Sequence, residues 1–257
     1  MTAALLAVGA ASAFDHGYAD YGRLLSAHVR WTASGHASVV DYDGLQREHA
    51  QLRAALAQWS AVEQGTFDGW TRAQQMAFLI NAYNGFTLEL ILTRYPDLKS
   101  IRDLGSLLRS PWKQPFFTLL GERRTLDWIE HDVLRPRYRD ARVHFAVNCA
   151  SIGCPALRPE PYVAERLDGQ LDDQTRRFLT DRTRNRYNAA DGRLHLSQIF
   201  RWYEDDFDAG GRGLQGWIAQ HADLLADNDA DRQKLRSGAV RVEHLSYDWA
   251  LNADRRR

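Results

Sequence analysis

The sequence predicts a helix-rich α+β fold, a single domain with a small antiparallel sheet packed against several helices. Three observations lead to this prediction. Apolar residues recur with helical spacing through most of the chain, and strand candidates are few and short. The expected helices and strands do not alternate regularly along the chain. The 257 residues, 44% hydrophobic and 11% aromatic, suffice for a sizeable core and exclude global disorder.

Helical periodicity dominates the chain. Thr71 or Asp68 can open the third expected helix, Asp127 caps the fourth and Ser197 caps the sixth. The expected helices cover residues 18–31, 43–59, 71–94, 127–135, 163–184, 197–207, 213–227 and 229–236.

Strand patterns are fewer. Residues 116–120 and 123–126 flank Gly121-Glu122, which is typical of a hairpin. Residues 143–147, 194–196 and 240–245 are further short strand candidates.

The N-terminal residues 2–13 are uncharged, small and apolar, and they end in Ala11-Ser12-Ala13. This is typical of a secretory signal peptide cleaved after Ala13, and a frayed apolar terminus is the alternative. We therefore expect a signal peptide at 1–13 and a single globular domain at 14–257, located in the periplasm or secreted. No other apolar stretch reaches the ~18–20 residues of a membrane span, so we expect no transmembrane segment after signal removal.

The charge balance and the absence of known motifs limit the classes of ligand that we expect. The 33 basic residues balance the 33 acidic ones, so no net field favours nucleic acid. The chain has no P-loop, no dinucleotide fingerprint and no G-x-S-x-G motif. We expect a small-molecule or peptide ligand of unknown identity, no nucleic acid and no cofactor.

Both cysteines lie in one short segment, residues 142–155, where an apolar run leads into small residues and then Pro155. A thiol in such a loop can be held as thiolate and exposed for reaction. If 143–147 is a regular strand, His144 and Cys149 lie on opposite faces, and the base for Cys149 comes from elsewhere.

His131 in the expected helix 127–135 is the predicted base, with Glu130 or Asn148 orienting its ring. A histidine beside a thiol supplies the pair needed for nucleophilic catalysis. A structural histidine that caps a helix or fills a polar pocket is the alternative for His131.

The cysteine pair itself allows other interpretations. Cys149 and Cys154 can close a small disulfide loop in an oxidising compartment, or they can form a redox-active pair. Together with His131 and His144 they could bind zinc, but the spacing fits no standard ligand pattern and no metal is expected.

Asn81 and Asn84 are three residues apart in a helix that is apolar nearly all round, so they project from the same face of a buried helix. Buried amides need hydrogen-bond partners. The pair either ties down neighbouring loops or lines the site, where it polarises a carbonyl or orients the histidine.

Four segments together resemble the family known as domain of unknown function 547: residues 78–84, 126–131, 144–155 and 199–207. Residues 38–45 and 245–252 are similar to the family's flanking segments, so the resemblance covers most of the mature chain. It implies a single domain but no particular activity. The polar signature that it marks consists of Asn81, Asn84, Glu130, His131, His144, Asn148, Cys149 and Cys154.

The leading hypothesis is a secreted thiol-dependent hydrolase or acyltransferase acting on an amide or thioester. Cys149 attacks, His131 transfers the proton, and Asn148, one of the 81/84 asparagines or loop N–H groups bind the oxyanion. The alternative is a non-enzymatic periplasmic binding or structural module with a Cys149–Cys154 disulfide, and a redox role is a third possibility.

Overall fold

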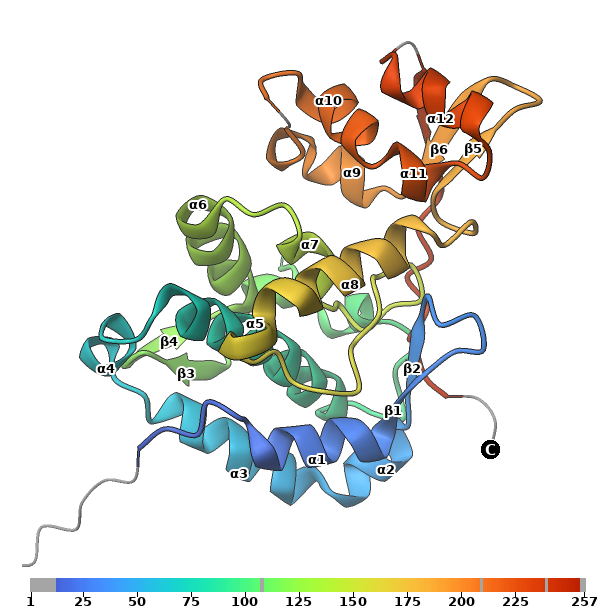
Figure 1. Ribbon diagram of the computed structural model, residues 1–257. Coiled ribbons are helices and arrows are strands. Elements are labelled where there is room, and N and C mark those ends of the chain that lie inside the picture. Colours follow the sequence, from blue (N-terminus) through green and yellow to red (C-terminus); the bar gives the residue numbers. More distant parts are fainter. Residues whose placement is uncertain (1–12, 107–108, 209, 239, 255–257) are drawn as a thin grey trace, which may run out of the picture.

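The computed structural model describes residues 13–106, 109–208, 210–238 and 240–254. Its fold is α+β with helices in the majority, as predicted (Figure 1). The expected signal peptide lies outside the described residues except for Ala13. Within the described ranges, none of the helices combines the length and apolar character needed to cross a membrane.

The N-terminal part of the chain packs around one long helix, α5. The helices of this part are α1 (Ala19–His28), α2 (Tyr42–Arg47), α3 (His49–Ser60), α4 (Gln64–Asp68) and α5 (Arg72–Leu92). α5 begins at Thr71 as predicted, because the Thr71 hydroxyl accepts from the Gln74 amide and the Gln74 side chain accepts from the Thr71 amide. Every residue of α5 from Gln75 to Leu88 is buried, so this helix forms the centre of the core.

The middle and C-terminal parts contain shorter helices, and those after α8 gather at the end of the molecule opposite α1 to α3 (Figure 1). The middle has the π-helix η3 (Trp128–Leu134), α6 (Arg135–Tyr138), α7 (Val143–Ala146) and α8 (Leu167–Leu179). After it come α9 (Ile199–Trp202), α10 (Gly213–Gln220), α11 (Ala222–Leu225) and α12 (Asp229–Arg236). Single 3₁₀ turns are η1 (Ile101–Leu104), η2 (Pro111–Lys113), η4 (Ala164–Arg166) and η5 (Glu204–Asp206).

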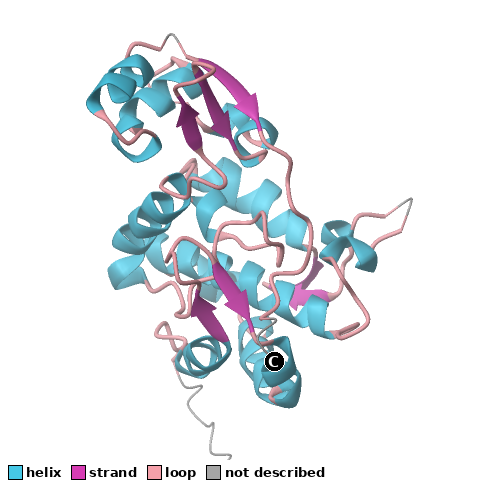
Figure 2. Ribbon diagram, turned by 90° about the vertical axis from the view of Figure 1, so that its right-hand side faces the viewer, coloured by secondary structure: helices cyan, strands magenta, loops and turns pink. Residues whose placement is uncertain are grey.

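The described strands form three small sheets at separate places in the molecule (Figure 2). The first pairs β1 (Val29–Trp31) with β2 (Ser38–Val40), and the second is the expected hairpin of β3 (Phe117–Leu119) and β4 (Glu122–Arg124). The third joins β5 (Arg186–Asn188), β6 (Arg193–Leu196) and β7 (Arg241–His244). All pairs are antiparallel except β6 with β7, which is parallel.

Two clusters of buried hydrophobic side chains meet at α7. Val143 and Ala146 belong to the cluster around α5, whereas Phe145 belongs to the cluster formed by α8 to α12. The loop that follows α7 therefore leaves the core at the junction of the two clusters. The single-domain assignment of 14–257 stays a prediction.

The expected strand at 143–147 is wrong, because residues 143–146 form the helical turn α7. A short apolar run has no periodicity that separates a strand from a buried helical turn. The predicted cap by Asp127 is also wrong, since the Trp128 amide donates to the Thr125 hydroxyl at 2.9 Å. Ser197 does accept a hydrogen bond from the Ile199 amide at the start of α9, at 3.3 Å.

Candidate functional site

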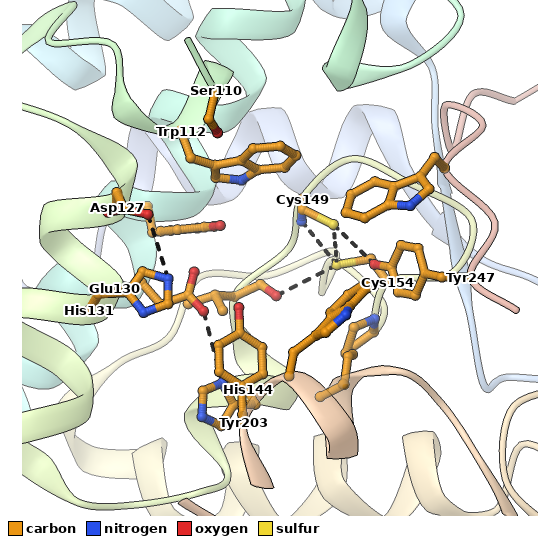
Figure 3. Close-up of a pocket in the computed structure, with 16 residues that line it drawn as sticks. Ser110, Trp112, Asp127, Glu130, His131, His144, Cys149, Cys154, Tyr203 and Tyr247 are labelled. Carbon is orange, nitrogen blue, oxygen red and sulfur yellow. Dashed lines mark hydrogen bonds and ion pairs between the residues drawn. The ribbon is translucent and has the colours of Figure 1, made fainter. Parts of the chain in front are cut away.

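A cavity of about 240 Å³ opens where η3, the loop after α7, α9 and the C-terminal segment meet (Figure 3). Aromatic and ionisable side chains dominate its wall. The aromatic ones are Tyr83, Trp112, Trp202, Tyr203, Tyr247 and Trp249, and the ionisable ones, apart from tyrosine, are Asp127, Glu130, His131, His144, Cys149 and Cys154. The cavity thus brings together five of the predicted site residues, namely Glu130, His131, His144 and both cysteines.

Cys149 lies in the loop after α7 with its sulfur surrounded by hydrogen-bonding groups. Its Sγ is 3.0 Å from Cys154 Sγ, 3.1 Å from Ser151 Oγ and 3.1 Å from the Tyr247 hydroxyl. A disulfide has an S–S length of about 2.05 Å. Both cysteines are therefore free thiols here, and the structure does not contain the disulfide considered above.

The two thiols differ in acidity. Hydrogen bonding from Cys154, supported by Ser151 and Tyr247, lowers the pKa of Cys149 against the opposing effects of burial and the Glu130 carboxylate. Burial and the neighbouring Cys149 sulfur raise the pKa of Cys154 well above its usual range. Of the two thiols, Cys149 therefore loses its proton first, while Cys154 keeps its own.

Asn84 and Asn148 hold the cysteine loop in place from behind. The Asn84 amide donates to Ala146 O at 3.0 Å and accepts from the Asn148 N–H at 2.8 Å. Asn148 in turn donates to Pro155 O at 2.7 Å and accepts from the Ala150 N–H at 2.9 Å. Since these amides are engaged with backbone groups, they position Cys149 and do not line the cavity.

Asn81 has the same kind of role at another loop. It donates to Tyr162 O at 2.8 Å and accepts from the Tyr162 N–H at 2.9 Å. Asn81 is buried and lies outside the cavity wall. The interpretation of the asparagines as ties for neighbouring loops therefore describes both Asn81 and Asn84.

His131 lies in η3, on the side of the cavity opposite Cys149 (Figure 3). Its Nδ1 is 2.8 Å from Arg135 Nη1, and its Nε2 is 3.6 Å from Asp127 Oδ1. Because a guanidinium can only donate, Nδ1 is the acceptor and the proton of a neutral ring is on Nε2. None of the hydrogen bonds among the described residues joins His131 to Cys149, whose sulfur contacts Ser151, Cys154 and Tyr247 instead.

His144 also lines the cavity and has its own polar partners. Its Nε2 is 2.6 Å from Asp206 Oδ2, its Nδ1 is 3.9 Å from Glu130 Oε1, and its ring stacks on Tyr203 with 3.9 Å between centroids. The expected separation of His144 from Cys149 by strand alternation does not apply, because His144 is in α7 and both residues line the cavity.

Arg135 and Asp206 connect the two histidines, since Arg135 Nε donates to Asp206 Oδ2 at 2.5 Å. Burial opposes ionisation of Asp206, but the hydrogen bonds and positive charges of His144 and Arg135 outweigh it and hold the pKa of Asp206 well below its usual range. The result is a continuous polar chain from Asp127 to Glu130 through His131, Arg135, Asp206 and His144.

Sequence reasoning did not single out Tyr203, Asp206 or Tyr247 as site residues. All three lie in segments that carry the family resemblance, residues 199–207 and 245–252. Their place in these segments was the available signal. Burial and the Glu130 carboxylate raise the pKa of Tyr203, and burial and the two cysteines raise that of Tyr247, so both hydroxyls keep their protons and can donate.

Among the described residues, no group of three or more histidine, cysteine, aspartate or glutamate side chains is arranged to hold a metal ion. The cavity wall carries a hydrogen-bonded thiol, carboxyl and imidazole groups, and several aromatic rings.

Comparison with curated proteins and with solved structures finds no significant match. Comparison with protein families finds one match, over residues 67–179. This range includes α5, η3 and both cysteines, whereas Tyr203, Asp206 and Tyr247 follow it. The predicted resemblance is confirmed: residues 67–179 of this chain match the family described as Protein of unknown function, DUF547.

Proposed function

We propose that this protein is a cysteine-dependent hydrolase or acyltransferase, with Cys149 as the nucleophile and an amide or thioester as the substrate. One observation carries the proposal. The Cys149 sulfur is within 3.0–3.1 Å of three hydrogen-bonding groups and lines a cavity whose opposite side holds Glu130 and His131. Hydrogen bonds that lower the pKa of a thiol in this way favour the thiolate, which is the nucleophilic form of cysteine.

The first step forms a bond between Cys149 Sγ and the substrate carbonyl carbon. The negative charge then moves from sulfur to the carbonyl oxygen, and the hydroxyls of Tyr247 and Ser151 are released from the sulfur to donate to that oxygen. The asparagines considered above for this role are engaged elsewhere.

Collapse of the intermediate breaks the bond to the leaving amine or thiol, which takes a proton from the opposite wall. The proposed acid is His131 in its imidazolium form, which requires Arg135 to leave Nδ1 so that this nitrogen can take up the proton released when Cys149 ionises. Water or another acceptor then attacks the thioester on Cys149, the same group removes the acceptor's proton, and the acyl group leaves with the acceptor. The thiolate is regenerated.

Intact-mass measurement after incubation with a small activated thioester tests this proposal. We expect one acyl group on wild-type protein, none on Cys149→Ala, and retention in Cys154→Ala at a lower rate. Iodoacetamide should label Cys149 in protein that has not been treated with reductant. Equal turnover by wild type and Cys149→Ala, or labelling only after reduction, would contradict the proposal.

A dithiol redox function is the second candidate, and the 3.0 Å distance between the two sulfurs favours it. An oxidant such as diamide would remove two protons and two electrons from the pair, form the Cys149–Cys154 bond and itself become the hydrazine. The expected readout is a mass lower by two hydrogens and complete protection from iodoacetamide. A redox role predicts faster thiol exchange with small disulfides than Cys154→Ala shows, whereas equal exchange rates would rule it out.

We also propose a periplasmic or secreted location, which the composition of residues 2–13 supports. Expression of the full chain in a Gram-negative host tests it. We expect the periplasmic fraction to contain protein that begins at Phe14, and full-length protein confined to the cytoplasm would contradict the proposal.

A further inference from the structure

We infer that the cavity beside Cys149 recognises a positively charged alkylammonium group of the substrate, held between aromatic rings and the carboxyl group of Glu130. The inference rests on the proposed function only for the statement that this cavity is the substrate site. Its evidence is the kind of side chain that forms the wall, and its binding test does not require Cys149.

Several aromatic rings form one wall of the cavity. Trp249 lies 5.6 Å from Trp202, 4.5 Å from Tyr247 and 5.8 Å from Trp112, measured between ring centroids. The Trp202 side chain is large and apolar, yet the residue is 45% exposed. Aromatic faces carry negative charge and attract alkylammonium groups more strongly than neutral groups of the same shape.

The charged side chains of the cavity wall favour a cation. Asp127 and Glu130 line the cavity, whereas neither lysine nor arginine occurs among the described residues that line it. Arg135 is the nearest cation in the polar chain, and it is engaged with Asp206 at 2.5 Å and with His131 at 2.8 Å. Beside Asp127 and Glu130 an anionic substrate group would be repelled and a cationic group attracted. Trp249 already holds one cation in this way, since Arg102 Cζ lies 5.4 Å from its ring centroid.

Glu130 is a buried acidic residue in this wall. The residue is 4% exposed, its carboxyl group is hydrogen-bonded to the Tyr203 hydroxyl, and its Oε1 lies 3.9 Å from His144 Nδ1. His144 Nδ1 is buried and has no hydrogen-bond partner in the structure. A bound ammonium group would bring a positive charge closer to this buried carboxyl group than His144 does.

The position of the nucleophile then defines the substrate class. Figure 3 shows Asp127, Glu130 and His131 on one side of the cavity and Cys149 with Tyr247 on the other. A short molecule within the cavity places its ammonium group between Glu130 and the aromatic rings and its carbonyl at Cys149. The volume of about 240 Å³ restricts the substrate part inside the cavity to a small one.

Calorimetric titration of the full chain carrying Cys149→Ala tests the binding step. The two probes are choline and its neutral isostere 3,3-dimethylbutan-1-ol, which share shape and differ in charge. We expect choline to bind at least about tenfold more tightly, in the range of a single cation–π contact with desolvation. Equal affinity for the two probes, or no binding of choline, would overturn the inference.

Three variants test whether the preference for choline arises in this cavity. Glu130→Gln and Trp202→Leu should each reduce the preference for choline severalfold, and the exposed Trp202 position tolerates substitution. Asp127→Asn should act in the same direction if Glu130→Gln does not fold. The matched control is Asp132→Asn, an exposed position on η3 outside the cavity wall, which should bind like the parent. An equal loss in Asp132→Asn would contradict the assignment to this cavity.

A second experiment separates this inference from the proposed function. Acetylthiocholine and the neutral S-(3,3-dimethylbutyl) thioacetate are given to protein with Cys149 intact, and acylation of Cys149 is read by mass. Faster acylation by the cationic ester supports both statements. Selective choline binding without any acylation would retain the cation site and reject Cys149 as an acyl-transfer nucleophile.

Discussion

The sulfur atoms of Cys149 and Cys154 lie 3.0 Å apart without a covalent bond. Cys149 is partly exposed and Cys154 is buried, and both line the cavity. The Cys149 N–H also donates to Cys154 Sγ, at 3.0 Å. This backbone contact and the short sulfur–sulfur distance fix the position of the second thiol. Cys154 is therefore in place to stabilise a thiolate on Cys149.

Replacing Cys154 should make Cys149 less acidic. Cys154→Ala removes the hydrogen bond that contributes most to the lowered pKa of Cys149, so the thiolate fraction at pH 7 should fall. A hydrogen bond to a charged group is worth about 1.5–3 kcal/mol, so alkylation at pH 7 should slow by about tenfold or more. The pH dependence of iodoacetamide alkylation measures this. Cys154→Ser keeps a donor and should lie between the two proteins, and a rate profile unchanged in Cys154→Ala would contradict the assignment.

Local sequence patterns predicted the parts of the fold that local physics determines. The capping box at Thr71, the apolar helix α5 and the β3–β4 hairpin each depend on residues within a few positions of one another. The helical turn α7 could not be predicted in this way. The hydrogen bonds of Asn84 to Ala146 and Asn148, which hold the end of α7, join residues more than sixty positions apart.

In the candidate site, too, residue type could be predicted from the sequence, whereas contacts between distant residues could not. Cys149, Glu130 and His131 stand out by residue type, and the structure places all three at one cavity. The groups that hold the thiolate include Tyr247, 98 positions from Cys149, and the partner of His144 is Asp206, 62 positions away. Contacts at such separations are fixed by tertiary packing, which a single sequence does not reveal.

Asp206 should matter more for stability at neutral pH than in acid. Its pKa is lowered in the folded protein relative to the value of about 3.9 expected for an unfolded chain, so its ionisation stabilises the fold above that pH. This contribution declines as the pH falls below about 4, where the unfolded chain takes up a proton first, and it is fully lost only as the pH falls through the lower folded-state pKa. We therefore expect Asp206→Asn to lower the free energy of unfolding more at pH 7 than at pH 3. Urea denaturation at the two pH values measures the difference, and an equal loss at both would contradict the charged interaction.

The same variant tests the positioning of His144. Asp206 accepts from His144 Nε2, so loss of the carboxylate should change the orientation or protonation of the ring without removing a group from the cavity wall. We expect the pH profile of turnover to shift in Asp206→Asn and to be partly restored in Asp206→Glu. A merely structural role would lower turnover without moving the profile.

Asn84 should be essential for the stability of the cysteine loop. Asn84→Ala leaves the Ala146 carbonyl and the Asn148 N–H buried without their partners, at about 1–3 kcal/mol each. We expect a loss of about 2–5 kcal/mol in the free energy of unfolding by urea. Gln58→Ala is the control, since Gln58 makes one long, exposed hydrogen bond and should change stability by less than about 0.5 kcal/mol. Similar effects of the two substitutions would show that the buried amide is dispensable.

Gly85 should tolerate no side chain, because α3 and α5 are in close contact there. A Cβ atom at Gly85 would lie 2.7 Å from Trp59 Cζ3 and 2.8 Å from Leu56 Cδ2, closer than carbon atoms pack. Trp59 and Leu56 are themselves buried, so they have little room to move.

Gly85→Ala should therefore lower the free energy of unfolding by about 1–3 kcal/mol, despite the higher helix propensity of alanine. The control is Gly169→Ala in α8, where a Cβ would meet no atom within 4 Å. That substitution should raise stability by about 0.5 kcal/mol, because alanine restricts the unfolded chain and favours helix. Urea unfolding of the two variants thus gives opposite signs if α5 is packed as described. A gain in both would mean that α3 can move away from Gly85 at little cost.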